Sequence, residues 1–399
     1  MGRQRARQRK AGMKKRVRKW AWCASVFLII ALIAWGLFWV RDEWQFRRAG
    51  KRLAAIEAER AIPDAENAAI IYDELLASHD PDSFSVGFLD FQADNSTAKE
   101  PWASEDYPEL AKWLKGHEGT LLKLLEASRK EKCRLPISIN PQEMADMTER
   151  LSAARQWAFL LARAANNDLG EGRIEAGLEK HVCLTQMAKH IYQQPLIIDF
   201  LVGAAMEGLA LNRMACFMVE GDAREVHLDM IETALASTKD NWSEDSSIVL
   251  EVERLVEKRR AKLGPPAETH LNLIERLRLW WRNFRDRDPS ETMHRAYFLV
   301  LRARRASRIL VALRRHKNKT GEWPQSLDAI RPSLSEEILV DPFNDGSFVY
   351  LLTGNDFRLY SKGENDIDED GKYGAGADDY SFWPPRSSRT QKRNEDARE

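Results

Sequence analysis

The stretch RAANNDLGEGRIEA, residues 163–176, links two segments that each carry an apolar stripe at helical spacing, 144–165 and 172–192. Two further segments with the same periodicity follow at 195–219 and 224–237, and the links between all four are short. Links of this length force neighbouring helices to run antiparallel. The sequence therefore predicts a stack of αα-hairpins and a mainly α fold class.

The first of these links also resembles the hairpins of tetratricopeptide-like proteins. Small residues such as Ala164 and Ala165 permit two helices to cross closely, as in that family. The sequence shows no repeat with the period of about 34 residues that true tetratricopeptide arrays have. The resemblance implies that the helical stack contacts other proteins rather than carrying out chemistry.

The histidines of the helical region, His181, His190 and His227, form no catalytic or metal-binding signature. No H-x-x-x-H or H-E-x-x-H pair occurs, and isolated histidines in helices are usually surface residues or hydrogen-bonded core residues. The G-x-S-x-G, Walker and dinucleotide-binding patterns do not occur in the sequence either. We therefore expect a non-enzymatic protein, with a membrane-tethered enzyme as an alternative.

Residues 20–40 form an uncharged segment of 21 residues in which Ser25 is the only clearly polar side chain. As an α-helix this segment would be about 31 Å long, which matches the apolar thickness of a bilayer. A cleaved signal peptide is the alternative, but no small-x-small site follows the segment. Because ten Lys or Arg residues precede it, we predict a single-pass protein of the bacterial inner membrane with a cytoplasmic N-terminus and an extracytoplasmic bulk.

The basic arm at 1–19 contains no aromatic residue among its cations. This composition favours contact with anionic membrane lipid over binding of RNA or DNA. The whole chain has 61 basic and 61 acidic residues, so no global positive field draws it to nucleic acid. We expect membrane lipid as a partner and no nucleic acid.

Four motifs near the C-terminus carry a family resemblance. They are Gly321-Glu322-Trp323-Pro324, Asp341-Pro342-Phe343, Leu359-Tyr360-Ser361-Lys362-Gly363 and the acidic run that begins at Asp366. In this order they resemble the C-terminal globular domain of the type II secretion major pseudopilin. The resemblance covers residues 291–385, implies a small α+β module, and implies a role in secretion or fibre assembly.

The same comparison separates this chain from true prepilins. Residues 20–40 lack the glycine-phenylalanine cleavage junction and the buried glutamate that prepilins carry at the start of their apolar helix. We therefore expect a prepilin peptidase to leave this chain uncut. The C-terminal module looks like a pseudopilin domain joined to a different membrane anchor.

Local sequence signals define the elements expected in the module. Residues 291–316 have one apolar side and predict a long helix, while 348–352 and 356–361 have high strand propensity and are joined by Thr353-Gly354-Asn355. This pattern predicts a β-hairpin beside the helix. Residues 78–106, in contrast, are rich in Asp, Ser, Pro and Asn and have no lasting period, so they predict a loop.

The acidic loop after the hairpin is a candidate calcium site. Three carboxylates at alternate positions, closed by Gly371, can be directed at one hard cation, and two more acids return across the loop. The candidate ligands are Asp366, Asp368, Asp370, Asp378 and Asp379.

An ordinary EF-hand is excluded because position 12 of the loop, counted from Asp366, is Ala377 rather than a glutamate. We expect Ca²⁺ as the cofactor, with a dissociation constant on the order of 10⁻⁴ to 10⁻³ M. The alternative interpretation is a solvated acidic turn.

We expect six regions along the chain. They are a basic cytoplasmic arm, a transmembrane helix, an extracytoplasmic helical domain of αα-hairpins, a helical connector, the pseudopilin-like α+β module and a disordered tail, at 1–19, 20–40, 41–238, 239–290, 291–385 and 386–399 respectively. The favoured function is that of a membrane-anchored protein associated with secretion or fibre components. The alternative is an envelope structural or adaptor protein whose helical domain holds a protein partner.

Overall fold

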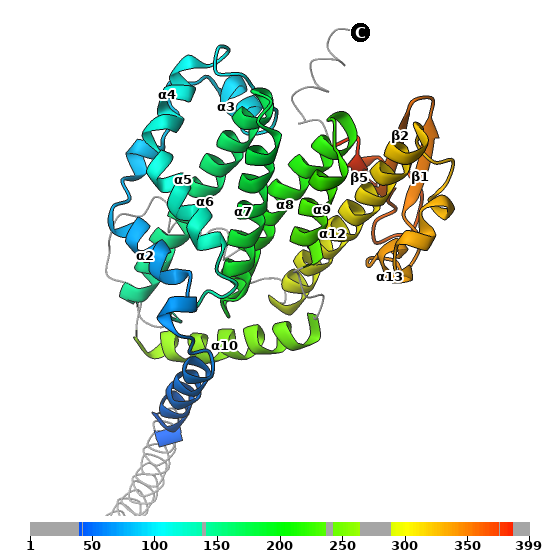
Figure 1. Ribbon diagram of the computed structural model, residues 1–399. Helices are drawn as coiled ribbons and strands as arrows, with labels where there is room; N and C mark the ends of the chain where they lie inside the picture. The colour runs from blue at the N-terminus through cyan, green and yellow to red at the C-terminus, as the bar shows by residue number, and fades with distance from the viewer. Residues whose placement is uncertain are drawn as a thin grey trace, which may run out of the picture. The chain divides into compact units, whose positions relative to one another are not determined.

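The computed structural model describes residues 40–41, 43–137, 141–236, 242–263, 289–374 and 376–385 (Figure 1). Over these residues the protein is mainly helical, with a small antiparallel sheet at its C-terminal end. This confirms the mainly α fold class. The arm at 1–19, the tail at 386–399 and the predicted membrane span, except for Val40, lie outside the described residues.

The described chain divides into two compact units. The first contains a helix over 43–59 and residues 254–263. Leu53 and Ile56 are buried in it, and the guanidinium group of Arg259 lies 3.8 Å from the centroid of the Phe46 ring. A cation over an aromatic face is attractive, and this contact joins the two segments of the unit.

The second unit contains the remaining helices and all described strands. Its helices are η1 (Asp64–Glu66), α2 (Ala69–Ala77), η2 (Pro81–Phe84), α3 (Phe91–Thr97), α4 (Pro108–Gly116), α5 (Glu118–Ser128), α6 (Pro141–Gly170), α7 (Ile174–Tyr192), α8 (Ile197–Glu220), α9 (Glu225–Ala236), the first part of α10 (Trp242–Leu263), α12 (Pro289–Thr320), η3 (Leu327–Ala329), η4 (Arg331–Ser333) and α13 (Glu336–Leu339).

The centre of this unit is the predicted series of hairpins. Helix α7 packs against both α6 and α8, and α9 follows after a short link (Figure 1). Gly172, with φ of 75°, makes the turn between α6 and α7, a conformation that favours glycine. The antiparallel packing expected from the short links is therefore present.

Helix α6 is longer than expected because the link 166–170 is helical rather than a loop. Its asparagines are satisfied from outside the helix: Asn166 Nδ2 donates to the Thr97 carbonyl at 3.0 Å, and Asn167 Nδ2 donates to Ser104 Oγ at 3.1 Å. The segment that supplies these partners was expected to be a loop, but it contains η2 and α3. Contacts distant in sequence thus override the local signal for a helix end.

Helix α8 is the one helix of the described residues that is long and apolar enough to cross a membrane by length and composition. Half of its most apolar stretch is buried inside the molecule, and its buried side chains include Phe200, Met214 and Phe217. This burial is typical of a core helix in a folded domain, and such helices can have the same length and apolar composition as membrane spans.

The C-terminal sheet has the order β1 (Val349–Thr353), β2 (Asp356–Ser361) and β5 (Tyr380–Trp383), with all pairs antiparallel. Val349 pairs with Tyr360 and Thr353 with Asp356, so β1 and β2 form the predicted hairpin. Two short strands, β3 (Tyr373–Gly374) and β4 (Ala377–Asp378), pair separately in the segment before β5.

Helix α12 connects the sheet with the helical hairpins. It packs against α8 and α9, and its buried Arg304 donates to the buried carboxylate of Glu207 on α8, with Nε at 2.7 Å and Nη2 at 2.8 Å. Ile309 and Phe357 belong to the same hydrophobic cluster as the cores of α6 to α8. The sheet and the hairpins therefore share one core.

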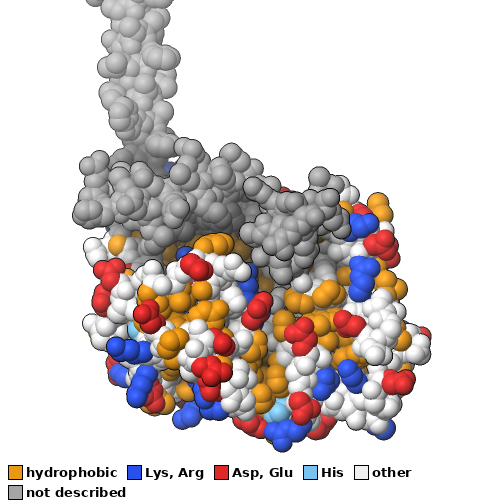
Figure 2. All heavy atoms as spheres, turned by 90° about the horizontal axis from the view of Figure 1, so that it is seen from above, with side chains coloured by type: hydrophobic (Ala, Val, Ile, Leu, Met, Phe, Trp, Pro, Cys, Tyr) orange, Lys and Arg blue, Asp and Glu red, His pale blue; other side chains and the backbone are white. Residues whose placement is uncertain are grey.

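The surface combines charged and apolar side chains. Figure 2 shows one face, on which hydrophobic side chains are exposed between acidic and basic groups. The most exposed of the large apolar side chains described is Phe91 in α3, at 80%. Scattered apolar exposure of this kind is normal for folded proteins and identifies no site by itself.

Candidate metal centre

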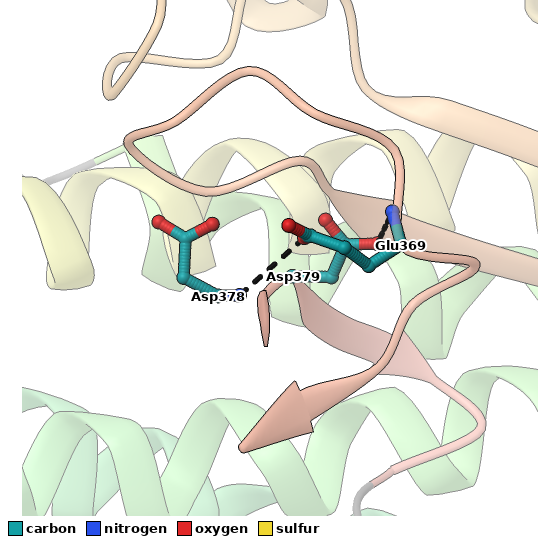
Figure 3. Close-up of side chains that lie close together, drawn as sticks. All are labelled: Glu369, Asp378 and Asp379. Atoms are coloured by element: carbon teal, nitrogen blue, oxygen red, sulfur yellow. Dashed lines mark hydrogen bonds between the residues drawn. The ribbon is translucent and has the colours of Figure 1, made fainter. Parts of the chain in front are cut away.

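Three carboxylates converge at the end of the acidic loop. Glu369 lies in the segment between β2 and β3, Asp378 ends β4, and Asp379 directly precedes β5 (Figure 3). One oxygen from each residue lies within 4.8 Å of the others. Figure 3 shows the Glu369 and Asp379 side chains next to each other, with the Asp378 carboxylate to one side.

Asp379 is fully buried, with no exposed surface. Its Oδ2 accepts hydrogen bonds from the backbone N–H groups of Glu369 at 2.9 Å and Gly371 at 2.7 Å. Its Oδ1 accepts no hydrogen bond from an N–H group of the described residues, and its side chain interacts with the Glu369 carboxyl. Burial raises the pKa of this carboxyl to about 6, because a charge is poorly solvated there.

Asp378 is held in the same way. Its Oδ2 accepts from the N–H groups of Glu364 at 2.8 Å and Asn365 at 3.3 Å, while its Oδ1 is buried and lacks a hydrogen-bond partner within the described chain. The loop approaches so closely that a Cβ on Gly363, whose φ is 70°, would lie 2.4 Å from Asp378 Oδ1. The glycine of the Leu-Tyr-Ser-Lys-Gly motif is therefore required here by both conformation and space.

Glu369 is the third member of the cluster. Its Oε1 accepts from Asn365 Nδ2 at 2.7 Å, and this hydrogen bond is the main reason that the pKa of Glu369 is lowered. Its Oε2 accepts from the N–H group of Asp378 at 3.4 Å. The cluster thus combines a carboxylate favoured in its charged form with the buried carboxyl of Asp379.

Helix α12 supports the loop through Arg302. The guanidinium group of this buried residue lies 4.4 Å from the centroid of the Phe343 ring and 4.5 Å from that of Tyr380. Its Nη1 donates to Ser361 Oγ at 3.0 Å, and the same oxygen accepts from the N–H group of Gly363 at 3.1 Å. These contacts position both ends of the acidic loop against the helix.

The alternating acids have other partners. Asp366 forms an ion pair with Lys362, and Asp368 Oδ1 accepts from the Tyr360 hydroxyl at 2.8 Å. The side chain of Asp370 is exposed. Of the five predicted ligands, the structure brings Asp378 and Asp379 together and leaves these three outside the cluster.

The backbone explains this separation. Alternate residues share one side only in an extended chain, whereas Asp366 and Asp370 have φ of 55° and 60°, in the left-handed region. Two turns therefore redirect the side chains between them, and Glu369 enters the cluster. The sequence analysis missed Glu369, although its place inside the acidic run was a usable signal.

The cluster is chemically suited to a hard divalent cation. All candidate donors are oxygens, which Ca²⁺ and Mg²⁺ prefer. Asp378 and Asp379 also each have one buried oxygen that accepts no hydrogen bond from an N–H group of the described residues. A buried acceptor without a partner costs about 1–3 kcal/mol, which coordination would remove. The residues present therefore fit a metal, with backbone carbonyls or water completing its shell.

A second group of ionisable side chains lines a cavity of about 40 Å³ between α2, α6, α7 and α8. Tyr72, Arg150 and Asp199 reach it through mainly apolar walls. Burial raises the pKa of Asp199 to about 7. Since organic ligands need pockets of about 300 Å³ or more, the cavity suits a few water molecules rather than a substrate.

The resemblance to the pseudopilin domain stays a prediction that rests on the four motifs. Comparisons of the chain with protein-family models, with curated proteins and with solved structures found no significant match to any of them.

Proposed function

We propose that this chain is a membrane-anchored, extracytoplasmic, non-enzymatic protein whose C-terminal module binds one Ca²⁺ through Glu369, Asp378 and Asp379. The observation that carries the proposal is the pair of buried oxygens, Asp378 Oδ1 and Asp379 Oδ1, which accept no hydrogen bond from an N–H group of the described residues. A cation bridging them to Glu369 supplies the missing interaction.

Calcium fits this environment better than magnesium. The cluster offers three side chains from an irregular loop, and Ca²⁺ is coordinated by roughly six to eight oxygens in a flexible geometry. Mg²⁺ demands a near-ideal octahedron and keeps much of its water. An extracytoplasmic location also supplies a compartment in which weak calcium sites are used.

The bound ion has a structural role in this proposal. Glu369 and Asp379 lie on the two sides of the loop, and Ser361 Oγ at its start accepts hydrogen bonds from Arg302 on α12 and from the N–H group of Gly363. Calcium closes the loop on the sheet and holds the module in one conformation. The module then presents a fixed surface to a secretion or fibre component, as the pseudopilin resemblance implies.

The alternative is an envelope adaptor, and the observation that favours it is the single hydrophobic core shared by the hairpins and the sheet, which holds them together as one body. Recovery of partners from solubilised membranes distinguishes the two. Secretion components support the first function, and other envelope proteins support the second.

The calcium site is tested by the melting temperature of the full-length protein with Ca²⁺ and with chelator. At a free concentration of about 100 times Kd, binding stabilises the folded state by about 2.7 kcal/mol. We expect Glu369→Gln to abolish the calcium-dependent shift and Asp370→Asn, at an exposed position, to retain it. If Asp370→Asn loses the shift and Glu369→Gln retains it, the calcium ligands are the alternating acids Asp366, Asp368 and Asp370 instead.

A further inference from the structure

Residues 40–41 and 43–59 are helical (blue in Figure 1) and have two sides of different character. One side is buried and consists of aliphatic residues spaced i, i+4 and i+7, which are Ala49, Leu53 and Ile56. Another side is formed by Arg41, Trp44 and Arg48, which are spaced i, i+3 and i+7 and are all exposed. Trp44 is 58% exposed, so this side is not covered by the described structure.

Trp44 and Arg48 contact each other on this side. The guanidinium carbon of Arg48 lies 5.1 Å from the centroid of the Trp44 ring, an attractive contact between a cation and an aromatic face. Side chains of an α-helix are directed toward its N-terminus. The positive charge of Arg48 therefore lies on the N-terminal side of its own Cα, in the direction of Arg41.

The charge of this side is positive. Neither Arg41 nor Arg48 forms an ion pair with a carboxylate of the described residues. Arg47, next in the sequence to Arg48, pairs with Glu43 at 2.7 Å, and exposed pairs of this kind contribute little to stability. Because Arg41 and Arg48 are not engaged by an acidic side chain, they are available to an anionic partner.

The position of these residues in the chain indicates which anions are near. The predicted span ends at Val40, and in a helix along the membrane normal Trp44 lies about 6 Å and Arg48 about 12 Å beyond it. The headgroup region extends roughly 5–7 Å beyond the hydrocarbon core on each side. Trp44 is then at headgroup depth, where tryptophan is favoured, and the direction of the Arg48 side chain brings its charge toward the same depth.

We propose that Arg41, Trp44 and Arg48 bind the headgroups of anionic phospholipids at the extracytoplasmic surface of the membrane. The Trp44 ring lies among the headgroups, and the two guanidinium groups donate hydrogen bonds to phosphate oxygens, for which their planar geometry is suited. The proposal rests on the membrane anchor of the proposed function and adds a lipid preference to it. It is distinct from the lipid contact of the arm at 1–19, which is expected on the cytoplasmic side.

The test is photolabelling of the full-length protein in proteoliposomes with phosphatidylglycerol or phosphatidylcholine probes that carry the same diazirine near the phosphate. We expect the phosphatidylglycerol probe to label residues 41–48 at least about fivefold more strongly, since each cation near an anionic surface contributes roughly this factor. Arg48→Gln should reduce the ratio about fivefold. Arg52→Gln is the matched control, because it removes an exposed cation of the same helix about 6 Å farther from Val40, and it should keep the ratio.

Equal labelling of 41–48 by the two probes would overturn the proposal, and so would an equal loss in Arg52→Gln and Arg48→Gln. A cross-link from this segment to a second copy of the chain, without lipid labels, would show that protein covers this side instead. Extraction of the chain from the liposomes by alkaline carbonate would contradict the membrane anchor and the proposal together. A chain that resists extraction but shows no lipid preference would contradict the lipid site alone.

Discussion

At the scale of single residues, the carboxylates of the acidic loop differ in how many of their oxygens have a partner. Asp366 is paired with Lys362, whereas Asp378 and Asp379 each keep one buried oxygen that accepts no hydrogen bond from an N–H group of the described residues. Density of negative charge alone would favour the exposed acids as ligands. The free energy of a buried unpaired oxygen instead favours Asp378 and Asp379.

The titration of Asp379 provides a prediction. Its pKa of about 6 lies above the ordinary value of 3.8, so the stability linked to this group is fully present below the ordinary value and is lost as pH rises through 6. In chelator, the melting temperature of Asp379→Asn should therefore rise relative to that of the wild type between about pH 4 and pH 7. With Ca²⁺, the wild type should gain stability over the same range because binding requires the ionised carboxyl. A difference between the two proteins that does not change with pH would contradict this assignment.

The sequence predicted part of this site, and the reason for the limit is local. Asp378 and Asp379 were expected as ligands because they return across the loop. Glu369 was missed because alternation was used to assign a common side, and the left-handed backbone at Asp366 and Asp370 changes which side chains meet. Short turns of this kind depend on hydrogen bonds such as Glu369 N–H to Asp379, which a spacing pattern does not contain.

At the scale of elements, the strongly periodic helices and the β1–β2 hairpin were predictable, whereas both ends of α6 were not. The link after residue 165 continues α6 to Gly170 because the side chains of Asn166 and Asn167 donate hydrogen bonds to backbone carbonyls of the segment around Trp102. The periodicity of apolar residues indicates which face of a helix is buried. It does not indicate which distant backbone groups will form hydrogen bonds with the end of the helix.

Gly170 tests this contact. A Cβ there would lie 2.3 Å from the Trp102 carbonyl oxygen, and backbone atoms cannot move aside cheaply. We expect Gly170→Ala to destabilise the protein by about 1–3 kcal/mol, measured by denaturant unfolding. Gly119→Ala in α5, where a Cβ meets nothing within 4 Å, should be neutral or stabilising by up to about 1 kcal/mol. Equal effects of the two substitutions would show that α6 does not end against this segment.

The ion pair between α8 and α12 gives a second prediction at this scale. Glu207→Ala leaves the buried Arg304 without its carboxylate and should cost about 3–5 kcal/mol in the free energy of unfolding. The double substitution Glu207→Leu and Arg304→Met should recover most of this loss, because it removes both charges. Glu336→Gln, at the exposed pair with Arg331, is the control and should change stability little. A single variant no worse than the control would mean that the pair does not hold α12 in place.

At the scale of the whole molecule, the predicted membrane anchor determines which compartment the proposed metal centre would face. The uncharged segment at 20–40 and the cations before it predict that everything after Arg41 is extracytoplasmic. A C-terminal alkaline phosphatase fusion should therefore be active in a bacterial host. Activity of a cytoplasmic reporter in place of the phosphatase at the same position would reverse the topology and remove the calcium-rich environment that the proposed site requires.

The central claim is that Ca²⁺ binds at Glu369, Asp378 and Asp379, and a crystal structure of the protein grown with CaCl₂ tests it most directly. The account predicts one ion at about 2.3–2.6 Å from Asp378 Oδ1 and Asp379 Oδ1, with Glu369 in its coordination shell. An ion bound instead by Asp366, Asp368 and Asp370, or no ion at either position in the presence of saturating calcium, would contradict it.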